Sequence, residues 1–100
     1  MTTRQRAKLR SMGTILEPIV HIGKEGINDN LCKQAWDALE ARELIKGRVL
    51  ENSMYTAREA AEELAVATRS EVVQVIGSKF VLYRYQHNKE KRKIQLVKAK

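Results

Sequence analysis

The chain has 100 residues, of which 43% are hydrophobic, so it is long enough for one domain with a modest core and too apolar for a disordered chain. No apolar run approaches the roughly 20 residues of a membrane helix, and the basic N-terminus lacks the apolar segment of a secretory signal. The single cysteine, Cys32, excludes an internal disulfide and favours a reducing, cytoplasmic location, while the net charge of +7 favours polyanionic partners.

A first helix is predicted from Thr2 or Thr3, either of which can cap it, to about Met12. Gly13 is the expected helix stop. This helix carries basic residues at two-residue spacing, which places them on more than one face and favours a broad electrostatic role over a single specific contact. These residues are Arg4, Arg6, Lys8 and Arg10.

The most informative segment follows Pro18, where the apolar run 19–22 predicts a short strand that ends in Gly23-Lys24-Glu25-Gly26. Asn28 is a good N-cap for the helix that follows. Glycine lets a backbone turn sharply and approach a partner closely, and a helix N-terminus attracts anions. This GxxG loop, with the charge of Lys24, is therefore a candidate clamp for a phosphate backbone. A tight strand-to-helix turn without a ligand is the alternative.

The second helix has an apolar stripe that is expected to face the core, made of Ile27, Leu31, Ala35, Ala38 and Leu39. Trp36 flanks this stripe, so we expect it in the core rather than as a platform for base stacking. Cys32 is expected to be a small buried hydrophobe. Residues 44–50 then predict a second strand, in which Gly47 suggests a bulge.

Thr56 and Glu59 have the spacing of a capping box, so a third helix is predicted to begin there, with an alanine-rich face turned inward. Residues 72–76 and 80–85 predict two strands, and the Gly77-Ser78-Lys79 segment between them predicts a hairpin.

Arg84 alternates with Tyr83 and Tyr85, so it faces away from them, on an open face where an RNA contact and a structural ion pair are both consistent with the sequence. A basic linker follows, and residues 94–97 either add a short strand or stay outside the fold. Lys91, Arg92 and Lys93 in this tail are expected to face phosphates, with a disordered basic tail as the alternative.

The predicted fold is a single two-layer α/β domain in the order α-β-α-β-α-β-β, with a mixed four-stranded sheet packed against helices. Its basic charge is concentrated at the ends, because residues 1–10 carry +4 and residues 86–100 carry +5, whereas the middle carries −2. Basic ends on a near-neutral core are suited to binding a polyanion with an affinity that falls as the salt concentration rises. The alternative is that the charged termini serve only solubility.

No catalytic constellation is apparent in the sequence. His21 and His87 are far apart, the lone Cys32 has no partner for a metal site, and no phosphate-binding or dinucleotide fingerprint occurs. His21 precedes the GxxG loop and is expected to be packed or hydrogen-bonded rather than a ligand. We therefore predict a protein that is not an enzyme and that uses no metal, cofactor or small-molecule substrate.

Four segments in the same order make the chain resemble YhbY-type proteins, which are stand-alone CRM domains (chloroplast RNA splicing and ribosome maturation). The segments are the basic first helix ending in Leu9-Arg10, the stretch from Pro18 to Ile27, the hairpin 73–84, and the tail Glu90-Lys-Arg-Lys-Ile-Gln-Leu96. The resemblance implies a CRM domain over residues 1–97, followed by a basic C-terminal end at 98–100. It also implies a fold similar to the C-terminal domain of translation initiation factor three.

The resemblance further implies RNA binding through the GxxG loop and, for bacterial members of this kind, association with precursors of the large ribosomal subunit. Two features depart from the family pattern. Residues 67–70 lack the glycine usual at the left-handed cap after the third helix, which predicts a cap that is either slightly strained or differently shaped. Glu25 places an acid in the loop, and we expect it to point away from RNA.

The sequence thus predicts a monomeric RNA-binding protein of large-subunit assembly that recognises RNA shape more than base identity. The alternative is a protein-interaction module whose sheet binds a ribosomal or assembly protein, with electrostatic steering toward RNA as its only nucleic-acid role. The candidate RNA-binding residues are Gly23, Lys24, Glu25, Gly26, Asn28, Arg4, Arg6, Lys8, Arg10, Arg84, Lys91, Arg92 and Lys93.

Overall fold

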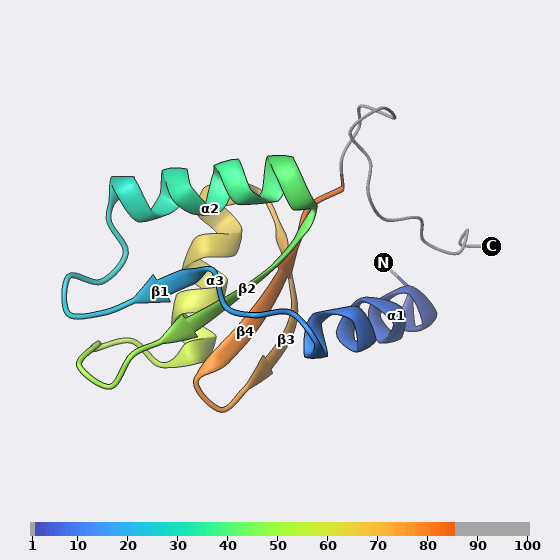
Figure 1. The fold of residues 1–100 in the computed structure, drawn as a ribbon, viewed down its shortest axis with the longest axis horizontal. Coiled ribbons are helices and arrows are strands. Elements are labelled where there is room, and N and C mark those ends of the chain that lie inside the picture. The colour runs from blue at the N-terminus through green and yellow to red at the C-terminus, as the bar shows by residue number, and fades with distance from the viewer. Residues whose placement is uncertain (1, 86–100) are drawn as a thin grey trace.

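The computed structural model describes residues 2–85, which form an α/β domain in the predicted order (Figure 1). Its helices are α1 (Thr3–Thr14), α2 (Asp29–Arg42) and α3 (Ala57–Thr68). Its strands are β1 (Val20–Ile22), β2 (Leu44–Val49), β3 (Glu71–Ile76) and β4 (Lys79–Tyr83). The α-β-α-β-α-β-β order is confirmed, and the segment 94–97 lies outside the described residues.

The strands form a mixed four-stranded sheet, as predicted, and their order in the sheet is β1-β2-β4-β3. β1 pairs with β2 in parallel, whereas β2 with β4 and β3 with β4 are antiparallel. The predicted bulge at Gly47 is wrong, because Gly47 pairs in regular register with Phe80. The irregularity lies in β3 instead, where the register shifts between Val72 and Gln74.

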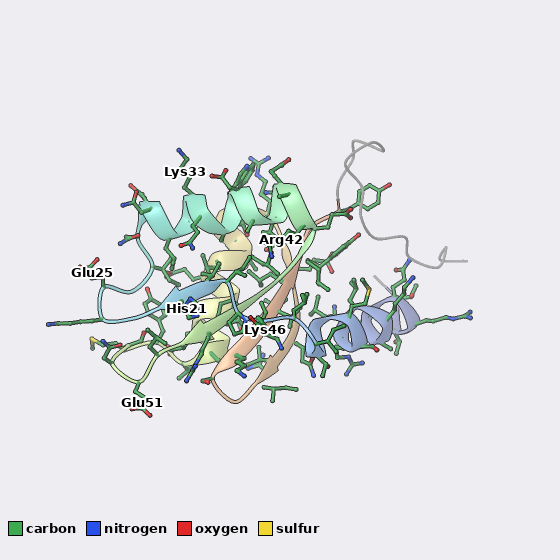
Figure 2. The ribbon with its side chains drawn as sticks, viewed as in Figure 1. His21, Glu25, Lys33, Arg42, Lys46 and Glu51 are labelled. Atoms are coloured by element: carbon green, nitrogen blue, oxygen red, sulfur yellow. The ribbon has the colours of Figure 1, made fainter. Side chains whose placement is uncertain are left out.

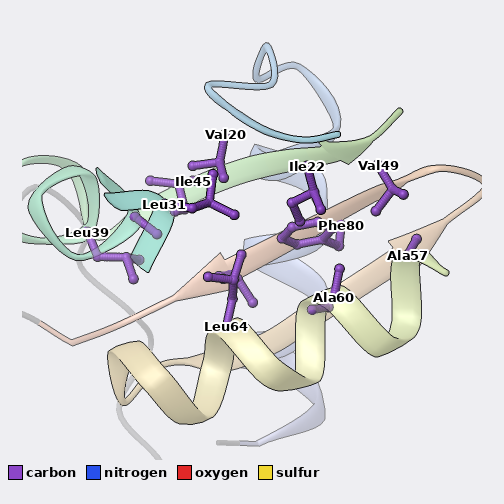
Figure 3. Close-up of a cluster of buried hydrophobic side chains, with 13 residues drawn as sticks. Val20, Ile22, Leu31, Leu39, Ile45, Val49, Ala57, Ala60, Leu64 and Phe80 are labelled. Atoms are coloured by element: carbon purple, nitrogen blue, oxygen red, sulfur yellow. The ribbon is translucent and has the colours of Figure 1, made fainter. Parts of the chain in front are cut away.

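The main core lies between one face of the sheet and helices α2 and α3 (Figure 3). Phe80 and Leu82 of β4 meet Leu39 of α2 and Leu64 of α3 there, and all four side chains are buried. Burying a side chain of this size stabilises the fold by about 1.5–3 kcal/mol. The fully buried Ala60 and Ala61 let α3 approach the sheet closely, as the alanine-rich sequence predicts.

Helix α1 packs on the opposite face of the sheet from α2 and α3, which differs from a strict two-layer arrangement. Its Leu9 is fully buried in a second cluster with Leu44, Val73, Val81 and Tyr83. These four strand residues alternate with, and face away from, those of the main core, because successive side chains of a strand point to opposite faces. Figure 1 shows α1 at one end of the sheet, so it covers only part of this face.

Gly13 does not stop α1, contrary to the prediction, because the helix continues to Thr14. Gly13 is buried, and a Cβ added there would lie 2.9 Å from Cγ2 of Val81. The glycine therefore serves close packing of the helix on β4 rather than helix termination.

The predicted N-caps are confirmed at all three helices that the structure describes. Thr2 and Thr56 form complete capping boxes with Gln5 and Glu59, and the Asn28 side chain accepts a hydrogen bond from the Leu31 N–H. No helix within residues 2–85 is both long and apolar enough to span a membrane.

Candidate nucleic-acid interface

The GxxG loop, Gly23–Gly26, is a tight turn between β1 and the N-terminus of α2. The Gly26 N–H donates to the Gly23 carbonyl at 3.1 Å, and Gly26 has a φ of +70°, a conformation that side chains disfavour. Lys24 and Glu25 at the tip are both exposed. The predicted strand-loop-helix arrangement is therefore present, with a lysine at its tip.

Helix α2 points its N-terminus toward this loop. Asn28 uses its side-chain oxygen to cap the Leu31 N–H at 2.9 Å, so this oxygen is already engaged in the helix cap. Two acids lie nearby, Asp29 in the first turn and Glu25 in the loop. Figure 2 shows Glu25 projecting outward from the loop. The helix dipole and Lys24 attract an anion here, while these acids limit how close it can come.

A shallow pocket of about 420 Å³ opens between the loop and the first turns of α2. Its wall includes loop residues Gly23 to Gly26, the exposed His21, and Asn30 and Gln34 of α2. His21 lines this pocket and is exposed, so of the expected packed or hydrogen-bonded side chain, the packed alternative is wrong. The lining is mostly polar, which suits a solvated sugar-phosphate backbone better than an apolar ligand.

Residues 50–56, which connect β2 to α3, lie against the GxxG loop. A Cβ at Gly26 would lie 3.1 Å from the ring of Tyr55, and one at Gly23 would lie 3.5 Å from side-chain atoms of Leu50 and Asn52. The Tyr55 hydroxyl donates to Glu63 of α3 at 2.9 Å, and this bond raises the pKa of Tyr55. The turn is thus fixed to α3 through one aromatic ring, a contact that the sequence did not predict.

Cys32 lies partly buried behind this site. Burial, followed by the nearby carboxylates of Asp29 and Glu63, raises the pKa of the thiol. A thiol in such surroundings stays protonated and unreactive at neutral pH. Among residues 2–85, no group of three or more histidine, cysteine or acidic side chains is arranged to hold a metal ion.

The basic residues of α1 lie at the other end of the molecule from the GxxG loop (Figure 1). Arg4, Lys8 and Arg10 are exposed. Arg6 is half-buried and donates to the Val72 carbonyl at 2.8 Å, so it ties α1 to β3. The structure therefore does not gather α1 and the loop into one pocket. Lys91, Arg92 and Lys93 lie outside the described residues.

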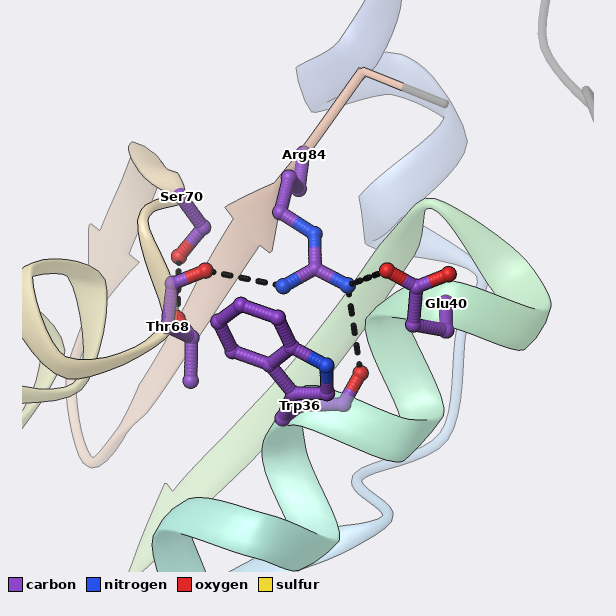
Figure 4. A network of polar contacts seen from close by, with 5 residues as sticks. All are labelled: Trp36, Glu40, Thr68, Ser70 and Arg84. Carbon is purple, nitrogen blue, oxygen red and sulfur yellow. Dashed lines mark hydrogen bonds and ion pairs between the residues drawn. The ribbon is translucent and has the colours of Figure 1, made fainter. Parts of the chain in front are cut away.

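Arg84 lies on the helix-covered side of the sheet, so its predicted place on an open face is wrong. Its guanidinium donates to the Thr68 carbonyl at 3.0 Å and pairs with Glu40 at 2.6 Å (Figure 4). It also lies 4.1 Å from the centre of the Trp36 ring. These contacts join the residue that follows β4 to α2 and to the end of α3, which supports the structural ion pair among the two alternatives.

Trp36 is not a core residue, because 38% of it is exposed. The sequence prediction placed it inward because it borders the apolar stripe. The stripe itself is confirmed, with Leu31, Ala35 and Leu39 buried. The indole instead packs under the Arg84 guanidinium at the surface, a pairing between residues far apart in sequence.

The sequence interpretation missed a set of basic residues on the sheet face that α2 and α3 do not cover. We call the part of it left exposed by α1 the open face. Its side chains are His21, Lys46, Arg48, Gln74, Ile76 and Lys79, assigned from strand alternation and register, and the exposed Glu71 lies on the same side of the sheet, opposite Tyr83. The sequence contained part of this information, because Lys46 and Arg48 are two residues apart in a predicted strand and their side chains therefore lie on the same face.

Comparison with known proteins agrees with this fold. The family model of the CRS1 / YhbY (CRM) domain matches residues 1–84. The chain is 46% identical over 96 residues to "Probable RNA-binding protein YqeI" of Bacillus subtilis, covering 96% of this chain and 98% of that protein. It is 35% identical over 104 residues to "Probable RNA-binding protein MJ0652" of Methanocaldococcus jannaschii, covering 95% and 77%.

A solved structure is also similar. The solution structure of the hypothetical protein SAV1595 from Staphylococcus aureus superposes with a TM-score of 0.77 at 51% identity, covering 97% of this chain and 99% of that one. The family match spans all seven helices and strands described above, including the GxxG loop. This chain therefore belongs to the CRS1 / YhbY (CRM) domain family.

Proposed function

We propose that this protein binds RNA, without catalysing a reaction, and acts in the assembly of the large ribosomal subunit. The GxxG loop and the N-terminus of α2 hold the RNA backbone, and Lys24 supplies the positive charge. The observation that carries this proposal is the exposed Lys24 at the tip of a tight turn, beside a polar pocket and a helix N-terminus. The names of the relatives from Bacillus subtilis and Methanocaldococcus jannaschii, each given as "Probable RNA-binding protein", support it.

The ribosomal part of the proposal rests on the family resemblance, in which bacterial stand-alone members accompany precursors of the large subunit. Recognition by shape fits the candidate site, because Lys24 reads a phosphate rather than a base edge. A precursor of ribosomal RNA is rich in folded backbone of this kind.

The clamp is tested by Lys24→Ala, alone and combined with Gly26→Ala. Removal of a charge-assisted hydrogen bond of about 1.5–3 kcal/mol lowers affinity by about tenfold or more. The Gly26 change adds a side chain at a φ of +70° and close to Tyr55, so it displaces the turn. Affinity is measured by filter binding with labelled fragments of large-subunit ribosomal RNA.

The matched control is Lys33→Ala, which removes an exposed lysine from α2 and the same amount of charge. A circular dichroism melt shows that each variant remains folded. Equal affinity of Lys24→Ala and Lys33→Ala would contradict the clamp.

The ribosomal role is tested by a sucrose gradient of a native cell extract at low and high salt. We expect the protein to migrate with large-subunit precursors at low salt and to leave them at high salt. A protein that stays at the top of the gradient at low salt would contradict the role in assembly and would favour the protein-interaction alternative.

A further inference from the structure

The open face carries a row of side chains that crosses all four strands. His21 of β1 is in register with Arg48 of β2, Arg48 with Lys79 of β4, and Lys79 with Ile76 of β3. Arg48 and Lys79 are exposed, and neither forms an ion pair within residues 2–85. Two like charges directly opposite each other on neighbouring strands destabilise a sheet. Such a pair is explained when an anion binds between them.

A groove of about 210 Å³ lies beside this row, between the end of α1 and the β3–β4 hairpin. The buried Val81 lies at its base, and its exposed apolar surface comes from Ile76 at its edge, which is 63% exposed. Lys46 and Lys79 stand on its sides, and Gln74 adds an amide that can both donate and accept. The Lys46 ammonium donates to the Thr14 carbonyl at 3.3 Å, which holds this lysine beside α1 (Figure 2).

We infer that the open face is a second RNA-contact surface, which takes a single-stranded segment with one unstacked base in the groove and its phosphates against Arg48 and Lys79. This inference rests on the proposed RNA-binding function and extends it. The combination of the exposed apolar Ile76 with lysines on the sides of the groove matches a nucleotide, which has an apolar ring face and an anionic backbone. A paired base is stacked inside its helix and cannot enter such a groove, so the ligand is single-stranded.

The open face also connects two basic regions that lie apart. Thr14, the last residue of α1, lines the groove, and His21 at the other end of the face lines the pocket of the GxxG loop. One RNA strand that follows the face would reach from α1 to Lys24. Among residues 2–85 no acid lines the groove, whereas Glu25 lines the loop pocket and Glu51 lines a hollow together with Arg48.

The first test is the double variant Arg48→Gln/Lys79→Gln, with Lys33→Gln/Arg58→Gln as a control that removes equal charge from exposed sites on α2 and α3. The probe is a labelled single-stranded RNA of mixed sequence. When two phosphates are no longer neutralised, the slope of log affinity against log salt decreases by about 1.4, at about 0.7 for each phosphate. The control leaves the slope unchanged, and both variants melt no lower than the parent protein.

The second test places the photoreactive residue p-benzoylphenylalanine at Ile76 or, as a control, at Val66, an exposed residue of α3 on the other side of the sheet. We expect crosslinks to RNA from position 76 and none from position 66. Unlabelled single-stranded RNA removes the crosslink, whereas a duplex of the same sequence does not.

The outcomes separate this inference from the clamp. If Lys24→Ala weakens binding while Arg48→Gln/Lys79→Gln does not, and position 76 gives no crosslink, the open face does not contact RNA and is left to a protein partner. If the face variant weakens binding while Lys24→Ala does not, the second surface stands and the clamp fails. Lack of RNA binding by the parent protein would overturn both.

Discussion

Gly47 shows at the scale of one residue how the sheet accommodates its core. A Cβ at this position would lie 2.3 Å from Cζ of Phe80, a distance at which one of the two residues must move. Phe80 is 1% exposed and lies in the main core, so its ring has little room to shift. The absence of a side chain at Gly47 therefore leaves room for the Phe80 ring against the β2 backbone.

Gly47→Ala is expected to destabilise the protein by about 1–3 kcal/mol, the usual cost of adding an atom to a packed core. Gly23→Ala is the matched control, because its added Cβ meets its nearest neighbours at an ordinary 3.5 Å. The measurement is the urea midpoint of each variant by circular dichroism. Equal midpoints for the two variants would show that the core adjusts to Gly47→Ala at no cost.

Arg84 shows that a basic side chain proposed from the sequence as an RNA contact can instead stabilise the fold. The side chain is 13% exposed at its ion pair with Glu40, whereas a residue that binds RNA must present its charge to solvent. The guanidinium satisfies carbonyls of α2 and α3 as well as this carboxylate. Of the two roles that the sequence left open for this charge, RNA contact and a structural ion pair, the structure supports the second.

At the scale of the element, α3 ends in an unusual way. Arg69 is its C-cap, with φ 56° and ψ 41° in the left-handed region, and its N–H donates back to the Val66 carbonyl. The absence of glycine in residues 67–70 predicted a cap that is either strained or differently shaped, and the left-handed φ of Arg69 supports the strained form. The buried hydroxyl of Thr68, which donates to the Leu64 carbonyl at 2.6 Å, helps to hold the last turn.

Arg69→Gly is therefore expected to stabilise the protein by about 0.5–1 kcal/mol. Relief of left-handed strain of about 1–2 kcal/mol exceeds the entropic cost of glycine, about 0.5–1 kcal/mol. Ala67→Gly, two residues earlier within α3, is the control and loses about 1 kcal/mol of helix propensity. Thermal melts measure both. A lower melting temperature for Arg69→Gly would show that the arginine side chain contributes more than its backbone strain costs.

At the scale of the whole molecule, positive charge is distributed rather than gathered at one site. The GxxG loop lies at one end, α1 at the other, and the open face between them (Figure 1). Exposed charges separated by more than about 10 Å act nearly independently at 0.1 M salt. Each region is thus expected to contribute separately to the free energy of RNA binding, in proportion to the number of phosphates that it neutralises.

Arg4→Gln/Arg10→Gln is expected to weaken RNA binding by a similar factor for every RNA sequence, because these exposed charges bind backbone and not bases. The salt slope decreases by about 0.7 for each phosphate that is no longer neutralised. Fluorescence anisotropy with two unrelated single-stranded RNAs measures both effects. Weaker binding of one RNA alone would instead indicate a sequence-specific role for α1.

Local signals in the sequence determined the helices, the strands and the GxxG loop. Thr2, Asn28 and Thr56 cap the helices where their side-chain chemistry predicts, and the glycines of the loop occupy the expected turn. Each of these features depends on residues within a few positions of one another. For the same reason the candidate loop site, including Lys24, was visible before the fold was known.

Interactions between distant residues decided the rest. The face that α1 covers, the close packing of Gly13 on Val81 and of Gly47 on Phe80, and the pairing of Trp36 with Arg84 all join segments far apart in the chain. Strand register likewise brought Arg48 and Lys79 opposite each other. A sequence specifies which side chains share one strand face, but only the pairing of strands and the placement of helices determine which faces meet and which remain open to solvent.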